Sequence, residues 1–109
     1  MVQFDRGLGS IAIRKRTNGS EGSVLLSVMN NSNSLIPSSK GSEWWTDDHA
    51  VSLTVSNSDT EGLKLLTVTI DGEAVISDWN FESGGGSYAG IRSWGVQTTY
   101  SEIEIGSAP

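Results

Sequence analysis

The stretch Leu63–Ser77, LKLLTVTIDGEAVIS, decides the fold. Leu66, Val68 and Ile70 alternate with threonines, which is the period-2 pattern of a strand with one face in a core. Asp71-Gly72 then accepts the positive φ angles of a type I′ turn. The residues after the turn are rich in β-branched side chains, which favour a returning strand. The stretch therefore predicts a β-hairpin.

Alternating apolar and polar residues recur on both sides of this hairpin. The other predicted strands are Ser10–Arg16, Ser23–Met29, Ala50–Ser56, Tyr88–Trp94 and Thr98–Ile105. On the last of these, we expect Ile103 and Ile105 to point inward while the glutamates between them face water. Counted with the hairpin, roughly eight short strands joined mostly by turns favour an antiparallel β-sandwich or jelly roll.

Composition supports an all-β domain. The chain has 109 residues, enough for one domain with one modest core. Only 36% of the residues are hydrophobic, and the chain is rich in Ser, Thr, Asn and Gly, as suits a protein of strands and turns. We expect residues 1–9 and 106–109 to be flexible or to lie at an edge. Two stretches lack periodicity, and both are predicted as loops, namely Asn30–Ser42 and the glycine-rich Asp78–Ser87.

Charge and residue usage exclude several classes of protein. A formal charge of −6 makes nucleic acid an unfavourable partner, because phosphate binding needs a basic face. No apolar run approaches the ~20 residues that cross a bilayer. Met1–Asp5 lacks the basic start and apolar stretch of a signal peptide. The absence of cysteine excludes a disulfide and a thiolate zinc site, and no cofactor is expected.

From Trp45 onward the chain resembles the concanavalin A-like lectin/glucanase superfamily. The motifs that carry the resemblance are Trp45, Val51–Val55, Leu66–Gly72, Gly90-Ile91-Arg92 and Tyr100–Ile105. It is most similar to accessory sugar-binding modules attached to bacterial glycoside hydrolases. The resemblance implies a jelly roll with one or two N-terminal strands missing or shortened. It also implies an extracellular or cell-surface location within a larger protein. Calcium is a common structural ion in that superfamily, but the sequence holds no Asp-x-Asp-x-Asp loop.

Aromatic residues in loops are the candidates for sugar contact, because the C–H surface of a sugar ring packs on an aromatic face. Trp44 and Trp45 are adjacent and would point opposite ways on a strand, so we expect Trp45 in the core and Trp44 as a platform. Trp79 lies in the predicted glycine-rich loop. The full set of candidate contacts is Trp44, Asp78, Trp79, Asn80, Tyr88, Arg92 and Trp94.

Each candidate has a structural alternative. Trp44 could pack under the Asn30–Ser42 loop, and Trp79 could cover one open end of the sandwich. Trp94 closes a predicted strand and suits the edge of the core. Arg92 could pair with a surface glutamate instead of forking to hydroxyl or carboxylate groups of a ligand.

Catalytic and metal sites are not predicted. Asp47-Asp48-His49 is consecutive on one extended segment, so its side chains cannot all converge, and we expect a solvated strand entry. Glu102 and Glu104 have the alternate spacing of a glycosidase pair. They lie on the outward phase of the last predicted strand without aromatic neighbours, so we interpret them as surface charges. We expect no enzyme and no metal ion.

Two hypotheses for function follow. The first is a non-catalytic carbohydrate-binding module that presents loop aromatics to a neutral glycan. The second is a structural or assembly domain of a fibre, adhesin or oligomer, in which the same aromatic loops make protein contacts. The sequence leaves open which sugar binds and which oligomeric state the chain adopts.

Overall fold

The computed structural model describes residues 1–82, 100 and 102–106. These residues form two three-stranded antiparallel sheets and almost no helix, which confirms the all-β prediction. Sheet A contains β1 (Val2–Asp5), β2 (Ser10–Thr17) and β3 (Ser20–Val28). Sheet B contains β4 (Val51–Asn57), β5 (Leu63–Ile70) and β6 (Glu73–Glu82). A single turn of 3₁₀ helix, η1 (Glu43–Trp45), lies between the sheets in the sequence.

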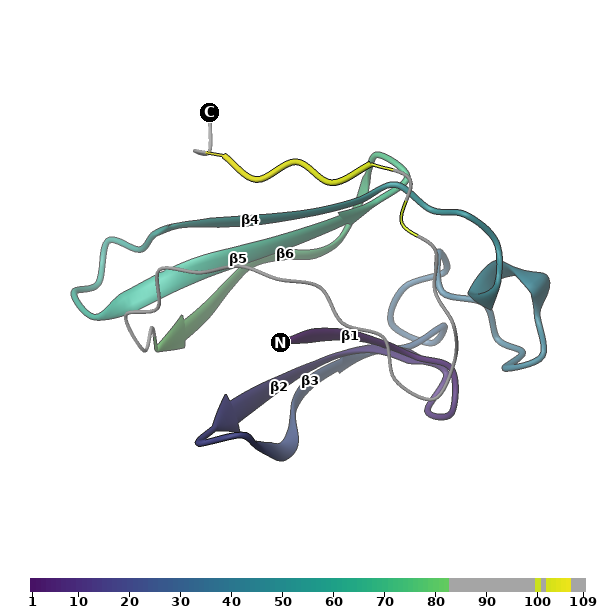
Figure 1. Cartoon of the computed structure of the whole chain (residues 1–109), viewed down its shortest axis with the longest axis horizontal. Helices are drawn as coiled ribbons and strands as arrows, with labels where there is room; N and C mark the ends of the chain where they lie inside the picture. Colours follow the sequence, from purple (N-terminus) through teal and green to yellow (C-terminus); the bar gives the residue numbers. More distant parts are fainter. Residues whose placement is uncertain (83–99, 101, 107–109) are drawn as a thin grey trace.

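The two sheets lie one above the other and contribute to one hydrophobic cluster (Figure 1). Sheet A supplies Ile11, Ile13 and Val28, and the long connection between the sheets supplies Ile36, which is fully buried. The larger share comes from sheet B, namely Leu66, Val68, Ile70, Val75 and Ile76. The inward phase of Leu66, Val68 and Ile70 matches the alternation in the sequence.

Each sheet contains a hairpin closed by a two-residue turn that ends in glycine. Asp71 has φ 51° and Gly72 has φ 84°, so the predicted turn between β5 and β6 is confirmed. Asn18 and Gly19 have φ 52° and 79° and join β2 to β3 in the same way. These positive φ angles let β3 begin at Ser20, directly after the turn and three residues before the predicted start of this strand at Ser23.

Strand order in the described part of the chain is a meander in each sheet. β1, β2 and β3 are neighbours in sequence order, and so are β4, β5 and β6. The described strands pass from one sheet to the other once, through residues 29–50. The alternation of consecutive strands between sheets that defines a jelly roll is not seen among the described residues.

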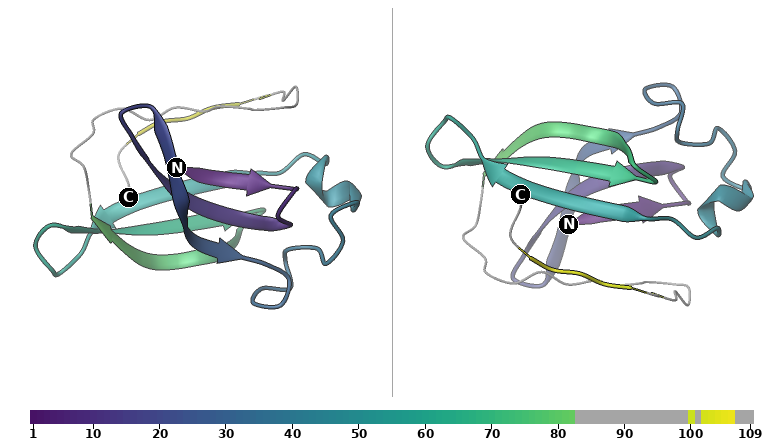
Figure 2. Two further views of the ribbon diagram at one scale, coloured as in Figure 1. Left: turned by 90° about the horizontal axis from the view of Figure 1, so that it is seen from below. Right: turned by 90° about the horizontal axis from the view of Figure 1, so that it is seen from above.

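The C-terminal part differs from the prediction where it is described. Residues 102–105 are not in a strand, and the side chains of Ile103 and Ile105 are 56% and 73% exposed, so the inward orientation expected for them is wrong. The segment runs roughly in line with β4, beyond its outer edge, without joining the sheet (Figures 1 and 2). The predicted strand Tyr88–Trp94 lies outside the described residues.

Candidate functional site

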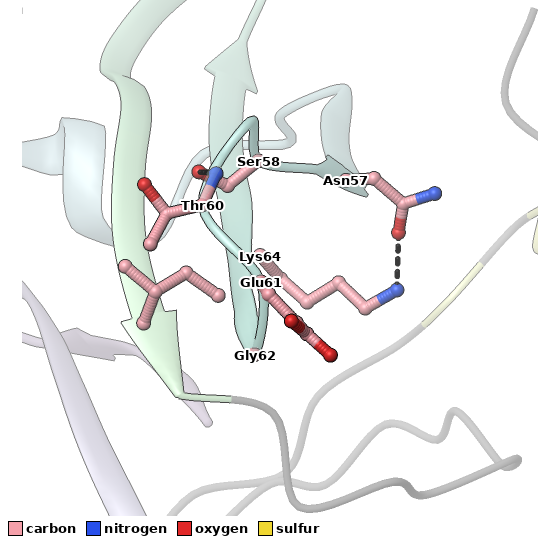
Figure 3. Close-up of a pocket in the computed structure, with 7 residues that line it drawn as sticks. Asn57, Ser58, Thr60, Glu61, Gly62 and Lys64 are labelled. Carbon is pink, nitrogen blue, oxygen red and sulfur yellow. Dashed lines mark hydrogen bonds between the residues drawn. The ribbon is translucent and has the colours of Figure 1, made fainter.

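A hollow of about 300 Å³, lined mostly by polar residue types, lies at the turn between β4 and β5. Its lining consists of Asn57, Ser58, Thr60, Glu61, Gly62, Leu63 and Lys64 (Figure 3). The turn holds its shape through local hydrogen bonds, because the Thr60 amide donates to Ser58 Oγ at 3.1 Å and the Leu63 amide donates to the Thr60 carbonyl at 3.2 Å. Gly62 has φ 83°, a conformation that suits glycine. The lining therefore offers hydroxyl, amide, carboxylate and ammonium groups in one place.

Cross-strand pairing extends this hollow into a row on three neighbouring strands. Asn57 on β4 is directly opposite Lys64 on β5, and Lys64 is directly opposite Phe81 on β6. Directly opposed residues share a face of the sheet with Cβ atoms about 4.5–5.5 Å apart. Lys64 Nζ donates a hydrogen bond to Asn57 Oδ1, as Figure 3 shows. Asn57, Lys64 and Phe81 thus occupy neighbouring positions on one face of the sheet.

The aromatic member of this row is placed by a β-bulge. Thr67 on β5 faces the two residues Ser77 and Asp78, because the register shifts between the pairs Leu66–Trp79 and Val68–Ile76. Asp78 has φ 47°, and its amide donates to Thr67 Oγ1 at 3.1 Å.

The extra residue reverses the phase of the rest of β6. Without the extra residue, Asp78 and Asn80 would lie on the same inward face as Ile76. With the extra residue, Trp79 and Phe81 turn inward, and Asp78 and Asn80 are exposed.

The loop predicted over Asp78–Ser87 is accordingly wrong in its first half. β6 continues to Glu82, so Asp78, Trp79 and Asn80 lie in a strand. Trp79 packs against the hydrophobic cluster and stacks on Phe81, with ring centroids 6.1 Å apart and planes 10° apart. Trp79 is half-buried, so its side chain contributes more to packing than a side chain in an open loop would.

Trp44 and Trp45 lie in η1 at the opposite end of sheet B from the hollow (Figure 1). The prediction that they point opposite ways on a strand, with Trp45 alone in the core, is wrong, because the segment is a 3₁₀ turn. The Ser42 side chain caps it by accepting a hydrogen bond from the Trp44 amide at 3.3 Å. Both rings are half-buried against the hydrophobic cluster and meet edge to face, with centroids 4.9 Å apart.

Trp44 also contacts residues from two other parts of the chain. Its ring stacks on that of Phe4 from β1 at a centroid distance of 6.2 Å, and it lies 4.4 Å from the imidazole of His49. These contacts occupy the ring in packing. We call Phe4, Trp44, Trp45 and His49 the aromatic corner.

His49 is the best-connected polar side chain of the aromatic corner. Nδ1 lies 2.6 Å from Asp71 Oδ2, and Nε2 lies 2.6 Å from the Trp44 carbonyl oxygen. A carbonyl oxygen only accepts, and an ionised carboxylate only accepts, so both contacts are hydrogen bonds at once when the imidazole carries a proton on each nitrogen. The expectation of a solvated strand entry holds for Asp47 and Asp48, which are exposed, but it is wrong for His49, whose side chain is only 11% exposed.

The pKa values of this pair follow from the same contacts. Burial by itself lowers the pKa of His49, but the hydrogen bonds to Asp71 and to the Trp44 carbonyl, together with the charges of Asp71 and Asp47, outweigh it and raise the pKa above its ordinary value. The hydrogen bonds that Asp71 accepts from His49 and from the Ala50 amide hold the pKa of that carboxyl below its ordinary value. The pair clamps the start of β4 to the turn between β5 and β6.

The candidate contacts named from the sequence therefore separate in space. Trp44 lies in the aromatic corner, while Asp78, Trp79 and Asn80 lie on β6 opposite residues 65–67 of β5. Tyr88, Arg92 and Trp94 fall outside the described residues. Trp44 and Trp79 therefore lie on different elements, and the part of the predicted loop after Glu82 falls outside the described residues.

Sequence reasoning missed the hollow because it searched for aromatic side chains. The signal for the hollow was the turn sequence NSDTEG at residues 57–62, followed by Lys64. Residues 57–64 contain hydroxyl, amide, carboxylate and ammonium groups. The local sequence does not indicate that Phe81 shares a face of the sheet with Lys64, because that position depends on the bulge at Asp78.

Two further features concern the part of the chain that the structure describes. No three His, Asp or Glu side chains gather there in a way that could hold a metal ion. None of the helical structure described there has the length and hydropathy of a membrane span. No protein-family model, curated protein or solved structure matches the chain.

Proposed function

We propose that this chain is a non-catalytic carbohydrate-binding module, and that a neutral glycan binds at the polar hollow and the adjoining row Asn57–Lys64–Phe81. The observation that carries the proposal is this row across three strands. Sugar recognition combines an apolar contact with hydrogen bonds to hydroxyl groups. Phe81 supplies the first, and the Asn57 amide and Lys64 ammonium group supply the second.

The charges around the hollow favour a neutral ligand. Lys64 and Glu61 carry opposite charges within the same lining, so the hollow itself has no strong excess of either sign. The chain as a whole has a formal charge of −6, which opposes an anionic ligand at longer range. Hydroxyl groups, which both donate and accept, match a lining that contains both kinds of partner.

The lining also supports binding without catalysis. Glu61 is the one carboxylate among the residues that line the hollow. Glycosidases that follow the usual mechanisms need two carboxyl groups flanking the scissile bond. Binding through hydrogen bonds and aromatic contact needs no such pair.

We further propose that sheets A and B are the two layers of a β-sandwich of the concanavalin A-like kind. The shared hydrophobic cluster and the sequence motifs from Trp45 onward support this. In such a protein the chain would act as an accessory domain of a larger extracellular or cell-surface protein.

Binding to a glycan array, followed by calorimetric titration of any sugar that binds, tests the proposed function. Lys64→Ala should weaken binding about tenfold or more, because a hydrogen bond from a charged donor is lost. Lys15→Ala is the matched control, since Lys15 is an exposed lysine of β2 in the other sheet, and this variant should bind as the unmodified protein does. A domain that binds no glycan, or a Lys64→Ala variant with unchanged affinity, would contradict the proposal.

A further inference from the structure

β4 forms one outer edge of sheet B. It pairs with β5 through seven consecutive residue pairs from Val51–Ile70 to Asn57–Lys64, without a register shift. No described strand pairs with its other side. Alternate backbone N–H and C=O groups along that side therefore point away from the sheet, where another strand could accept and donate hydrogen bonds.

The other three outer strands carry features that discourage such pairing, and β4 does not. β1 has only four residues and includes Asp5. β3 and β6 each contain two register shifts, and both carry charged residues. β4 has the sequence VSLTVSN, with no charge, no proline and no bulge. Among the described strands it is thus the one regular and unprotected edge.

An exposed apolar row accompanies this edge. The exposed fractions of Val51, Leu53 and Val55 are 47%, 56% and 49%. Through the β4–β5 pairing these three residues share a face with the row of β5 residues that is buried in the hydrophobic cluster. The apolar face of sheet B therefore continues to its edge, where about half of each of these three residues remains exposed.

The sequence of β4 is complementary to itself in the antiparallel direction. If Thr54 is placed opposite Thr54 of a second copy, Leu53 lies opposite Val55 and Ser52 lies opposite Ser56. Leu53 and Val55 then meet on one face, where the outermost pair is Val51 with Asn57, and hydroxyl groups meet on the other face. No like charges oppose one another, although the whole chain is acidic.

We propose that β4 is a self-association edge, at which a second copy of this chain pairs antiparallel about a two-fold axis through Thr54. The two copies would share one continuous sheet, and the apolar rows of both would join across the axis. This goes beyond glycan binding and does not depend on it. It also moves the assembly surface from the aromatic loops, where the sequence suggested it, to β4.

The C-terminal segment is the competing occupant. It runs beyond the same edge, but it leaves both its own Ile103 and Ile105 and the row of Val51, Leu53 and Val55 exposed (Figures 1 and 2). It also carries Glu102 and Glu104, whereas β4 carries no positive charge to receive them. These features favour the second copy over this segment.

Sedimentation equilibrium of the full chain over about a hundredfold range of concentration provides the first test. The chain should form a dimer, and Leu53→Lys should make it monomeric. Leu25→Lys is the matched control, because Leu25 lies on the bulged strand β3 and is 53% exposed, close to the 56% of Leu53. This control should leave the dimer intact. A second variant, Val55→Lys, serves if Leu53→Lys does not fold by circular dichroism.

A cysteine cross-link tests the register, since the chain has no cysteine of its own. Directly opposed Cα atoms lie about 4.5–5.5 Å apart, within the roughly 4.4–6.8 Å that a disulfide spans. Thr54→Cys should therefore form a disulfide-linked dimer on oxidation. Ser56→Cys should not, because its two copies would be offset by about 13 Å along the strands.

Several results would overturn the proposal. One is an unmodified chain that stays monomeric throughout the concentration range. Another is a dimer that survives both lysine substitutions on β4. A chain that dimerises only after residues 102–109 are deleted would show that its own C-terminal segment occupies the edge. Efficient cross-linking of Ser56→Cys but not of Thr54→Cys would reject the two-fold register.

Discussion

The two outer strands of sheet B, β4 and β6, differ in regularity and in charge. β6 is irregular, with two register shifts, a positive φ at Asp78, and acidic residues at both ends. β4 is regular and uncharged. Each bulge in β6 buries further apolar residues, so that Val75 and Ile76 are both in the core and Trp79 and Phe81 pack against it. β4 keeps its alternation and leaves its apolar row exposed.

This difference shows that a perfect alternation pattern does not by itself guarantee burial. Val51, Leu53 and Val55 have the cleanest alternation in the sequence, and they point to the correct face of the sheet, yet they remain half-exposed at its edge. The irregular strand contributes more to the core. Irregularity in β6 serves packing and the candidate site, while regularity in β4 leaves a surface that suits another strand.

The largest expected effect comes from comparing one apolar residue on each outer strand. Trp79→Ala should lower the free energy of unfolding by on the order of 3 kcal/mol, because the ring packs on the core and stacks on Phe81. Leu53→Ala should cost about 0.5 kcal/mol or less under dilute conditions, since the side chain is 56% exposed. Urea unfolding measures both. Equal losses would mean that β4 is as firmly packed as β6.

A smaller effect is expected where β4 begins. His49 has a raised pKa in the folded protein, so its contribution is fully present below its unfolded pKa of about 6.5 and is lost as the pH rises through the folded value. The pKa of Asp71 is lowered, so its contribution is present above its unfolded value and is lost only as the pH falls through the folded value. The clamp therefore acts between these limits, in mildly acidic to near-neutral solution.

Thermal unfolding at about pH 5.5 and about pH 8.5 measures this contribution. The unmodified protein should melt a few degrees above His49→Gln at the lower pH, and the gap should shrink at the higher pH. Asp71→Asn is the control, because asparagine tolerates the positive φ of the turn but lacks the charge. A gap that is independent of pH, or larger at the higher pH, would show that the His49 imidazole does not carry its extra proton in the fold.

Features set by neighbouring residues could be predicted from the sequence. The β5–β6 hairpin follows from alternation and from Asp71-Gly72, because turn chemistry and strand period act within a few residues. β2 follows from Ile11 and Ile13 in the same way. Asn18-Gly19 carried the same local signal, and the turn there could have been predicted as well.

Features set by contacts between distant residues could not be predicted. The bulge at Asp78 involves its contact with the Thr67 side chain, eleven positions away, and it decides which face Trp79 occupies. Trp44 was placed on a strand because its capping by Ser42 and its packing against Phe4 were invisible in the local pattern. Within the candidate site, the polar turn sequence at residues 57–62 was a local signal for the hollow. No local signal indicated that Phe81 would lie opposite Lys64.

The contrast between the two outer strands is tested most directly by amide hydrogen exchange along β4, measured residue by residue at low and high protein concentration. In dilute solution, alternate amides between Val51 and Asn57 should exchange rapidly, because they point away from β5. At high concentration the same amides should become protected, while those of β6 should not change. Protection of every β4 amide at all concentrations would contradict the account, because the edge would then already be paired within a single chain.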